Sequence, residues 1–179
     1  MTNILIISGT NRPNTHASRI DEFVRKKYEE IGASASVFEL KDYPFEDTLD
    51  GSYDSTKPRI KAINERLINA DGLVFVVPEY NGSFPGVLKV MLDHTPYPSA
   101  LGHKPIAYIG EASGAFGSLR SVEQLQLVLN YMNALSYPER VFIQRVSKSW
   151  SDENGPTDPF TAKLLDEQIS GFVKFVNTF

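Results

Sequence analysis

The sequence predicts an α/β protein in which helices cover both faces of a parallel sheet. The first observation is the set of apolar runs at residues 3–8, 72–77 and 105–110, which are too continuously hydrophobic for strands with one face in water. The second is the helical spacing of apolar residues in the stretches between such runs. Strands that alternate with helices are joined by right-handed crossovers, so they run parallel to one another.

Five strands are predicted in this chain. The first, at 3–8, and the third, at 72–77, are rich in the β-branched residues that favour sheets. The second lies at 36–40, the fourth at 105–110, and the fifth includes 141–143, each a short apolar run next to polar residues or glycine.

Five helices are predicted to alternate with these strands, because apolar residues recur near helical spacing in each, as Ile60, Ile63 and Leu67 do in the second. Gly32 is a plausible end for the first. Turn-rich or polar connections are expected at 41–56 and 151–159. The five helices are expected at 16–31, 57–70, 84–94, 118–133 and 160–177.

A doubly wound sheet of five strands is commonly flavodoxin-like, a three-layer sandwich with strand order 2-1-3-4-5. The length of 179 residues fits one domain with a real core, so residues 1–179 are predicted to form a single domain. In this topology the loops after strands one, three and four meet at the carboxyl edge of the sheet, where open α/β sheets bind ligands.

Composition excludes several classes of function. A net charge of -4 disfavours a general binder of nucleic acid or of anionic membranes, and the absence of cysteine excludes disulfides, thiolate nucleophiles and cysteine metal sites. His16, His94 and His103 lack metal-ligand spacing, so no metal is expected. A strand begins where a signal peptide would lie, and no apolar run approaches the roughly 20 residues that cross a bilayer. We therefore expect a cytoplasmic protein.

The loop after strand one, residues 8–18, has the donors of a phosphate site. It contains several hydroxyls and Arg12, and it opens a helix whose first N–H groups carry partial positive charge. It has neither the Lys-Ser/Thr end of a Walker loop nor the pattern G-x-G-x-x-G, so a terminal phosphomonoester fits better than a nucleoside triphosphate or a Rossmann-type dinucleotide. The alternative is a turn whose hydroxyl only caps the helix.

The loop after strand three, residues 78–86, reads Pro-Glu-Tyr-Asn-Gly-Ser-Phe-Pro-Gly. Tyr80 and the backbone around Asn81 could lie against a flat heterocycle, and Asn81 could either bind the ligand or hold the loop in shape. The alternative is a strand-to-helix turn with Ser83 as the N-cap and Pro85 in the first helical turn. Glu79 is a lone loop carboxylate, and such groups are more often solvated than catalytic.

The loop after strand four, residues 111–118, contains two glycines around an aromatic residue. Gly114 and Gly117 let the backbone approach a ligand closely, and Phe116 could cover the edge of a ring. For this segment alone, a flexible glycine loop is the alternative. Three such loops at one edge of the sheet favour one shared site over three unrelated turns.

These loops resemble those of the NADPH-dependent FMN reductase family, flavodoxin-like reductases of quinones, chromate and azo dyes. Residues 9–15 are similar to its G-S-x-R-x-x-S phosphate loop, with two threonines in place of serine. Residues 78–89 are similar to its P-E-Y-N-x-S-x-P-G-x-L-K signature, and residues 113–117 to its third flavin loop. Val90 and His94 stand where members often have Asn and Trp, and Ser118 replaces a common glycine.

The resemblance implies which residues hold FMN, and it assigns no side chain a catalytic role. The flavin phosphate would be surrounded by Thr10, Arg12, Thr15 and Ser18. The isoalloxazine ring would be bordered by Pro78, Glu79, Tyr80 and Asn81. Its other side would be closed by Ser113, Gly114, Phe116 and Gly117.

The activity implied by the resemblance is that of an FMN-dependent NAD(P)H oxidoreductase. NADPH or NADH would pass hydride to the bound flavin and leave, and a small-molecule acceptor such as a quinone, free flavin, azo compound or metal oxyanion would then bind. The flavin carries the chemistry, and the protein orients it. Two alternatives stay open: a flavodoxin-like electron carrier, against which the modest net charge argues, and a non-catalytic flavin-binding redox sensor.

The resemblance also implies a homodimer or homotetramer. The connection at 41–56 and the third and fourth helices are candidate contacts between subunits. Neither nucleic acid nor a membrane is expected as a partner.

Overall fold

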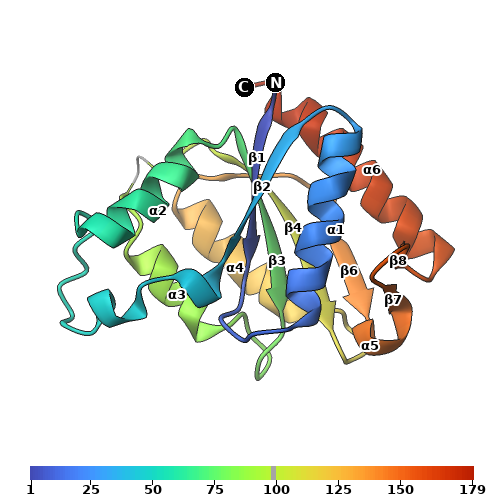
Figure 1. Cartoon of the computed structure of the whole chain (residues 1–179), viewed down its shortest axis with the longest axis horizontal. Coiled ribbons are helices and arrows are strands. Elements are labelled where there is room, and N and C mark those ends of the chain that lie inside the picture. The colour runs from blue at the N-terminus through green and yellow to red at the C-terminus, as the bar shows by residue number, and fades with distance from the viewer. Residues whose placement is uncertain (98–99) are drawn as a thin grey trace.

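The computed structural model describes residues 1–97 and 100–179 and places a parallel sheet between two layers of helices (Figure 1). The strand order is β2-β1-β3-β4-β5, and β6 also pairs with β4. This is the order 2-1-3-4-5 that the sequence predicts, and every pairing in this sheet is parallel.

The predicted elements lie close to the observed ones. The strands are β1 (Asn3–Ser8), β2 (Ser34–Glu39), β3 (Gly72–Pro78), β4 (Pro105–Ala112), β5 (Leu135–Ser136), β6 (Val141–Gln144), β7 (Trp150–Ser151) and β8 (Gly155–Pro156). The helices are α1 (His16–Glu30), α2 (Pro58–Asn69), α3 (Gly86–Asp93), α4 (Leu119–Tyr131), α5 (Val146–Ser149) and α6 (Pro159–Val176), with the short 3-10 helices η1 (Leu40–Asp42) and η2 (Phe45–Thr48).

The fifth position of the sheet differs from the prediction, because two short strands share it. Leu135 pairs with Pro105 in β4, and Val141 pairs with Ile109 further along the same strand. Between β5 and β6 lies Pro138, which has no N–H to donate to a ladder. The connection at 151–159, predicted to be a polar loop, overlaps the β7–β8 hairpin, which begins at Trp150, and that at 41–56 overlaps both 3-10 helices, the first of which begins at Leu40.

Alternation along the buried strands divides the core between the two faces of the sheet. Ile4 and Ile6 of β1 face the layer formed by α1 and α6. Leu5 and Ile7 face the layer formed by α2, α3 and α4. Since both faces are covered, the central strands must be apolar on both sides, which explains their continuous hydrophobic runs.

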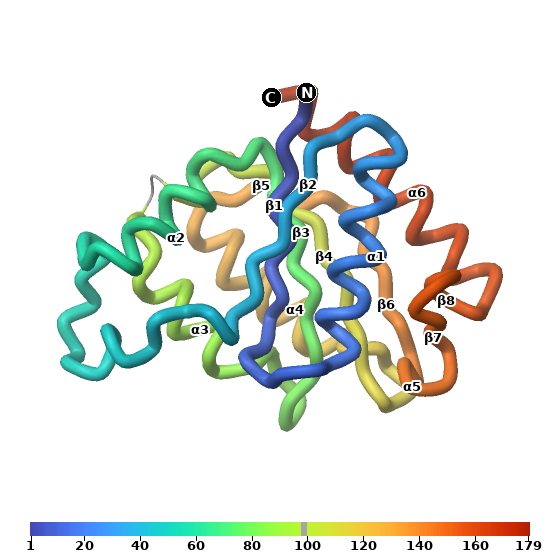
Figure 2. Tube along the Cα trace, in the orientation of Figure 1, coloured from blue at the N-terminus to red at the C-terminus, as the bar shows by residue number. Residues whose placement is uncertain are grey.

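The two edges of the sheet have different roles in the molecule. The two chain termini lie side by side at the amino edge (Figure 2). The loops that follow β1, β3 and β4 come together at the opposite, carboxyl edge. The topology thus places the three chemically unusual loops of the sequence at one edge.

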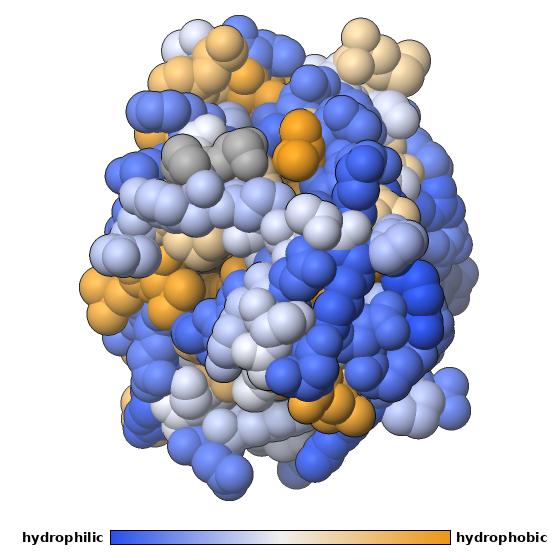
Figure 3. Space-filling model, turned by 90° about the vertical axis from the view of Figure 1, so that its left-hand side faces the viewer, coloured by the Kyte–Doolittle hydropathy of each residue, from blue (hydrophilic) through white to orange (hydrophobic). Residues whose placement is uncertain are grey.

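The side of the molecule on which α2 and α3 lie has hydrophobic patches among its polar side chains (Figure 3). Several large apolar residues of α4 and of the 41–56 connection are exposed in the single chain. They are Leu49, Tyr53, Leu127 and Tyr131. Among the described residues, no helix combines the length and the hydropathy needed to cross a membrane.

Candidate functional site

The first loop, residues 9–15, leads from β1 into α1 and is fixed at both of its ends. The N–H of Gly9 donates to the carbonyl of Val76 in β3 over 2.8 Å. At the other end, Thr15 caps α1, because its Oγ1 accepts a hydrogen bond from the N–H of Ser18 over 3.3 Å. The positive end of the α1 dipole therefore lies at the carboxyl edge of the sheet, with the exposed Arg12 in the same loop.

Tyr80 joins the first loop to the second loop, residues 79–85. The Thr10 and Tyr80 hydroxyls lie 2.8 Å apart, and Thr10 is buried. The guanidinium carbon of Arg12 lies 4.6 Å from the centroid of the Tyr80 ring, within cation–π range. Two loops separated by about seventy residues are thus in direct contact through side chains that the sequence singles out.

The second loop is a tight reversal of the chain around Asn81 and Gly82. Tyr80 and Ser83 exchange both backbone hydrogen bonds, at 2.9 and 3.1 Å. Asn81 and Gly82 have φ of 53° and 78°, so both central residues are left-handed, as in a type I′ turn. This conformation fits the role of Asn81 in holding the loop in shape, and a contact of its side chain with a ligand stays a prediction.

Helix α4 holds the second loop from the opposite side. Gln124 donates from Nε2 to the carbonyl of Gly82 over 2.9 Å and accepts from the Ser83 hydroxyl over 2.6 Å. One helical turn earlier, Arg120 pairs with Glu79 at 3.0 Å. The prediction of Ser83 as an N-cap is wrong, since α3 begins after Pro85 without a side-chain cap, and the Ser83 hydroxyl is used by Gln124.

Glu79 is not the freely solvated carboxylate expected from its place in a loop. Its side chain is 15% exposed and is paired with Arg120, whose guanidinium carbon also lies 4.6 Å from the ring centroid of Phe116. Arg120 therefore connects the second loop to the third loop, residues 113–118.

The third loop folds back closely over the end of β4. A Cβ added at Gly110 would lie 2.4 Å from the carbonyl oxygen of Gly117, so only glycine allows this approach. The carbonyl of Gly114 accepts a hydrogen bond from the N–H of Arg145 over 3.0 Å, which ties the loop to the segment after β6. Ser113, Gly114 and Phe116 remain exposed at the edge of the sheet.

The structure brings the sequence-predicted residues to one edge of the sheet. Thr10, Arg12 and Tyr80 contact one another, and Glu79 and Phe116 are bridged by Arg120. The Ser18 hydroxyl lies 3.3 Å from the Thr15 hydroxyl and also donates to Glu39 at the end of β2 over 3.1 Å. Glu39 is in turn paired with Lys41 at 2.8 Å.

Sequence reasoning missed Arg120 and Gln124. Both lie on α4 directly after the third loop, four residues apart and therefore on one helix face. That spacing was visible in the sequence. Their partners in the second loop, some forty residues away, were not.

Two buried carboxyl groups lie on the α1 side of the same edge. Asp21 of α1 is almost fully buried, and neither of its carboxyl oxygens has a hydrogen-bond partner among the described residues. Burial raises its pKa well above the ordinary value; the nearby Ser8 side chain acts against this, and the charges of Glu39 and Glu111 act in the same direction as burial. Burial also raises the pKa of Glu111, at the end of β4, to about 7.

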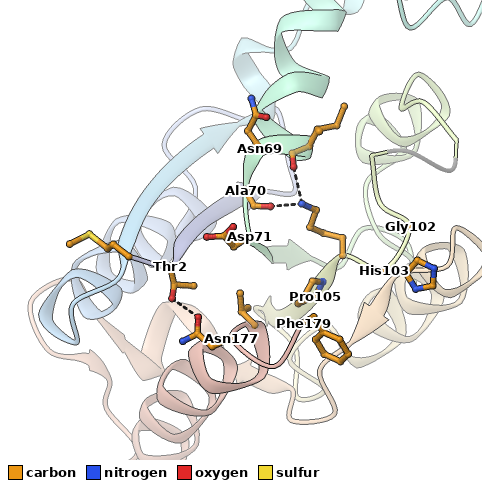
Figure 4. Close-up of a pocket in the computed structure, with 13 residues that line it drawn as sticks. Thr2, Asn69, Ala70, Asp71, Gly102, His103, Pro105, Asn177 and Phe179 are labelled. Atoms are coloured by element: carbon orange, nitrogen blue, oxygen red, sulfur yellow. Dashed lines mark hydrogen bonds between the residues drawn. The ribbon is translucent and has the colours of Figure 1, made fainter.

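A hollow of about 720 Å³ lies at the amino edge, far from these loops (Figure 4). Its polar groups mostly join chain segments. Thr2 donates to Asn177 over 2.8 Å, and the Lys104 ammonium donates to the carbonyls of Ile68 and Ala70 at the end of α2. Within residues 1–97 and 100–179, no three His, Asp or Glu residues are grouped so that they could hold a metal ion.

Comparison with known proteins places this chain among flavin reductases. The family model described as NADPH-dependent FMN reductase matches residues 2–147. NADH:(hydroxy)cinnamate reductase subunit CrdA of Vibrio ruber is 28% identical over 177 residues, covering 97% of this chain and 86% of that protein. The FMN-dependent NADPH-azoreductase of Staphylococcus aureus is 26% identical over 179 residues, covering 94% of each chain.

Solved structures agree on the fold. The flavoenzyme NAD(P)H:(acceptor) oxidoreductase FerB from Paracoccus denitrificans superimposes with a TM-score of 0.82 at 23% identity, covering 99% of this chain and 98% of that one. A flavodoxin from the domain Archaea gives a TM-score of 0.65 at 11% identity, with 98% and 99% of the two chains covered. The flavodoxin-like fold predicted from the sequence is therefore confirmed.

Proposed function

Because this chain belongs to the NADPH-dependent FMN reductase family, we propose that it is an FMN-dependent NAD(P)H oxidoreductase whose residues 1–179 act as one flavin-binding domain. The observation that carries the proposal is the contact between the three loops that match the family's flavin motifs, through Tyr80 on one side and Arg120 on the other. Bound FMN supplies the ring that takes up and passes on hydride. The chain supplies binding and orientation.

The donors of the first loop support binding of the flavin phosphate. Arg12 offers a forked cation without a carboxylate partner among the described residues, and the first N–H groups of α1 point out of the helix. Thr15 lies at the helix start with its hydroxyl. Thr10 and Ser18 act less directly in this assignment, because Thr10 holds Tyr80 and Ser18 holds Glu39.

The second and third loops would enclose the flavin ring. Pro78 ends β3, and Glu79, Tyr80 and Asn81 follow at the carboxyl edge in a turn that α4 holds rigid. Ser113, Gly114 and Phe116 are exposed at the same edge after β4, and Gly117 is buried beneath them against Phe142. Exposed backbone N–H groups there can hold the polar edge of the ring.

The acceptor belongs to the small molecules on which this family acts. We include quinones, free flavin, azo compounds and metal oxyanions, with NADPH or NADH as the reductant. The azoreductase of Staphylococcus aureus is the relative whose name supports an azo acceptor and NADPH. The proposal also places the protein in the cytoplasm, where NADPH is kept reduced.

We further propose a homodimer or homotetramer in which α3 and α4 form a contact. A hollow of about 610 Å³ between these helices is lined by Leu92, Leu127, Val128 and Tyr131, among others. Of these, Leu127 is 72% and Tyr131 80% exposed, and large apolar side chains exposed at one place are typical of a subunit interface. Lys89 and Asp93 line the same hollow and pair with each other at 2.6 Å, so they leave no unpaired charge in it.

The direct test is the absorption spectrum of the purified protein, followed by turnover with NADPH. We expect the yellow colour of bound flavin, as isolated or after addition of FMN, and NADPH-dependent reduction of a quinone. A colourless protein that does not bind added FMN would reject the proposal.

Stopped-flow mixing with NADPH separates the enzyme from the two alternatives. An oxidoreductase bleaches its flavin directly when NADPH is added, whereas an electron carrier stays oxidised until a partner reductase is present. A redox sensor would be reduced without sustained turnover of NADPH and acceptor.

A further inference from the structure

A third hollow, of about 520 Å³, lies beside the candidate flavin site, on the outer edge of the sheet. It is formed by β6, α5 and the beginning of α6, which lie next to one another at the lower right of Figure 1. Its volume is in the range of small-molecule pockets. Its cations are Arg140, Arg145 and Lys148, and its aromatic residues are Phe142 and Phe160.

The groove carries uncompensated positive charge. Among residues 1–97 and 100–179, no carboxylate lies within ion-pair distance of Arg140, Arg145 or Lys148. The one carboxylate in its lining, Asp158, caps α6 and accepts from the N–H and hydroxyl of Thr161. In a chain with a net charge of -4, three cations gathered in this way favour an anionic ligand.

The aromatic residues indicate that this anion also carries a flat ring. The guanidinium carbon of Arg140 lies 5.5 Å from the ring centroid of Phe142. Phe160 is 68% exposed, although it is large and apolar. Arginine and an open aromatic face together suit a phosphate attached to a heterocycle, because the first forks onto phosphate oxygens and the second stacks on a ring.

The groove is continuous with the third loop of the candidate flavin site. The N–H of Arg145 donates to the carbonyl of Gly114 over 3.0 Å. Gly117 packs so closely on Phe142 that an added Cβ would lie 3.0 Å from its backbone. A ligand that reaches from the flavin ring across the third loop would therefore enter the groove.

We infer that this groove binds the phosphate-bearing adenosine half of NADPH or NADH while the nicotinamide lies at the flavin. The inference rests on the proposed function and adds to it a place for the part of the reductant that does not react. The family model ends at residue 147, so Lys148 and Phe160 lie outside the matched region. The groove is thus built in part from a segment that family membership does not describe.

The test compares two double variants that remove the same charge. Arg140→Gln with Lys148→Gln removes two cations from the groove and leaves Arg145, whose backbone supports the third loop. Lys61→Gln with Lys163→Gln removes two cations from exposed i,i+4 pairs on α2 and α6. We expect the groove variant to raise KM for the reductant about tenfold or more, with kcat at saturation and the FMN dissociation constant within twofold of the native protein. The control should change none of these.

Calorimetric titration of the flavin-free protein with 2′,5′-ADP provides a readout that needs no turnover. Native protein and the control should bind it, and the groove variant should bind at least tenfold more weakly. Since this measurement does not involve flavin, binding that depends on Arg140 and Lys148 would support the groove even if the reductase function failed. If the protein is an active reductase but its binding of 2′,5′-ADP does not depend on Arg140 and Lys148, the inference is wrong and the proposed function stands.

The KM values for the two reductants also test the inference. If KM of the groove variant rises for NADPH but not for NADH, the groove binds the 2′-phosphate. If KM rises for both reductants, the groove binds the pyrophosphate that they share. Either result supports the inference. An unchanged KM for the reductant contradicts the inference. This holds also if a sulfonated azo acceptor binds the groove variant more weakly while a neutral quinone does not, because the groove would then bind the acceptor. A loss of FMN affinity contradicts it as well, because the groove would then belong to the flavin site.

Discussion

Glu111 is one of two buried carboxyl groups, with Asp21, through which stability should depend on pH. Its carboxyl group is buried on the α1 side of the carboxyl edge, and burial raises its pKa from 4.5 to about 7. Between these values the unfolded chain has lost the proton while the folded chain keeps it. The free energy of unfolding therefore falls as pH rises from about 4.5 to about 7.

Glu111→Gln removes the part of this dependence that Glu111 supplies, because the amide cannot ionise, and leaves the part that Asp21 supplies. At pH 8 we expect the variant to be more stable than the native protein by up to about 3 kcal/mol, and at pH 4 the two should be alike. Urea unfolding over this pH range measures the effect. The exposed Glu123→Gln is the control on α4, and equal pH slopes for the Glu111 variant and the native protein would contradict the assignment.

The role of a side chain could be predicted from the sequence where the residue belongs to a motif. It could not be predicted where a contact with a distant residue determines that role. The phosphate donors of the first loop follow from Arg12, the hydroxyls and the helix start. The use of the Thr10 hydroxyl could not be foreseen, because its partner, Tyr80, is 70 residues away. For the same reason Glu79 gave no sign that Arg120 would pair with it.

At the scale of elements, the turn at Asn81 and Gly82 is the part of the site most sensitive to a small change. Gly82 has φ of 78°, and an L side chain in this conformation costs about 1–2 kcal/mol. Gly82→Ala should therefore lower the free energy of unfolding by this amount and weaken FMN binding, since Tyr80 and Ser83 close the same turn.

Gly86→Ala is the matched control for that change. Gly86 begins α3, no atom lies within 4 Å of an added Cβ, and its φ is not left-handed. The control should be as stable as the native protein or slightly more so, because alanine favours a helix. Urea unfolding and FMN titration of both variants decide the point, and equal effects at the two glycines would refute the role given to the turn.

Helices and strands were predictable because burial on two faces leaves a strong pattern. Continuous apolar runs marked β1, β3 and β4, and helical spacing marked the long helices. The pattern weakens where an element is short. The two-residue β5 and the β7–β8 hairpin depend on pairing with other segments, and no local periodicity predicts them.

At the scale of the whole molecule, we expect the protein to self-associate through α3 and α4. Leu127→Glu should shift the protein toward monomer, because it places a charge in an apolar contact. Phe179→Glu is the control, since both side chains are 72% exposed but Phe179 lies at the chain terminus on the amino edge. Sedimentation velocity measures both. A monomeric native protein, or an unchanged Leu127 variant, would exclude this interface.

The central claim is that three loops at the carboxyl edge build one flavin site, and titration of flavin-free protein with FMN tests it most directly. We expect one FMN per chain, with quenched flavin fluorescence. Arg12→Ala should weaken binding by about 1.5–3 kcal/mol, the range of a charged hydrogen bond, while Arg59→Ala on α2 leaves it unchanged. No binding by the native protein, or equal affinity after loss of Arg12, would contradict the account.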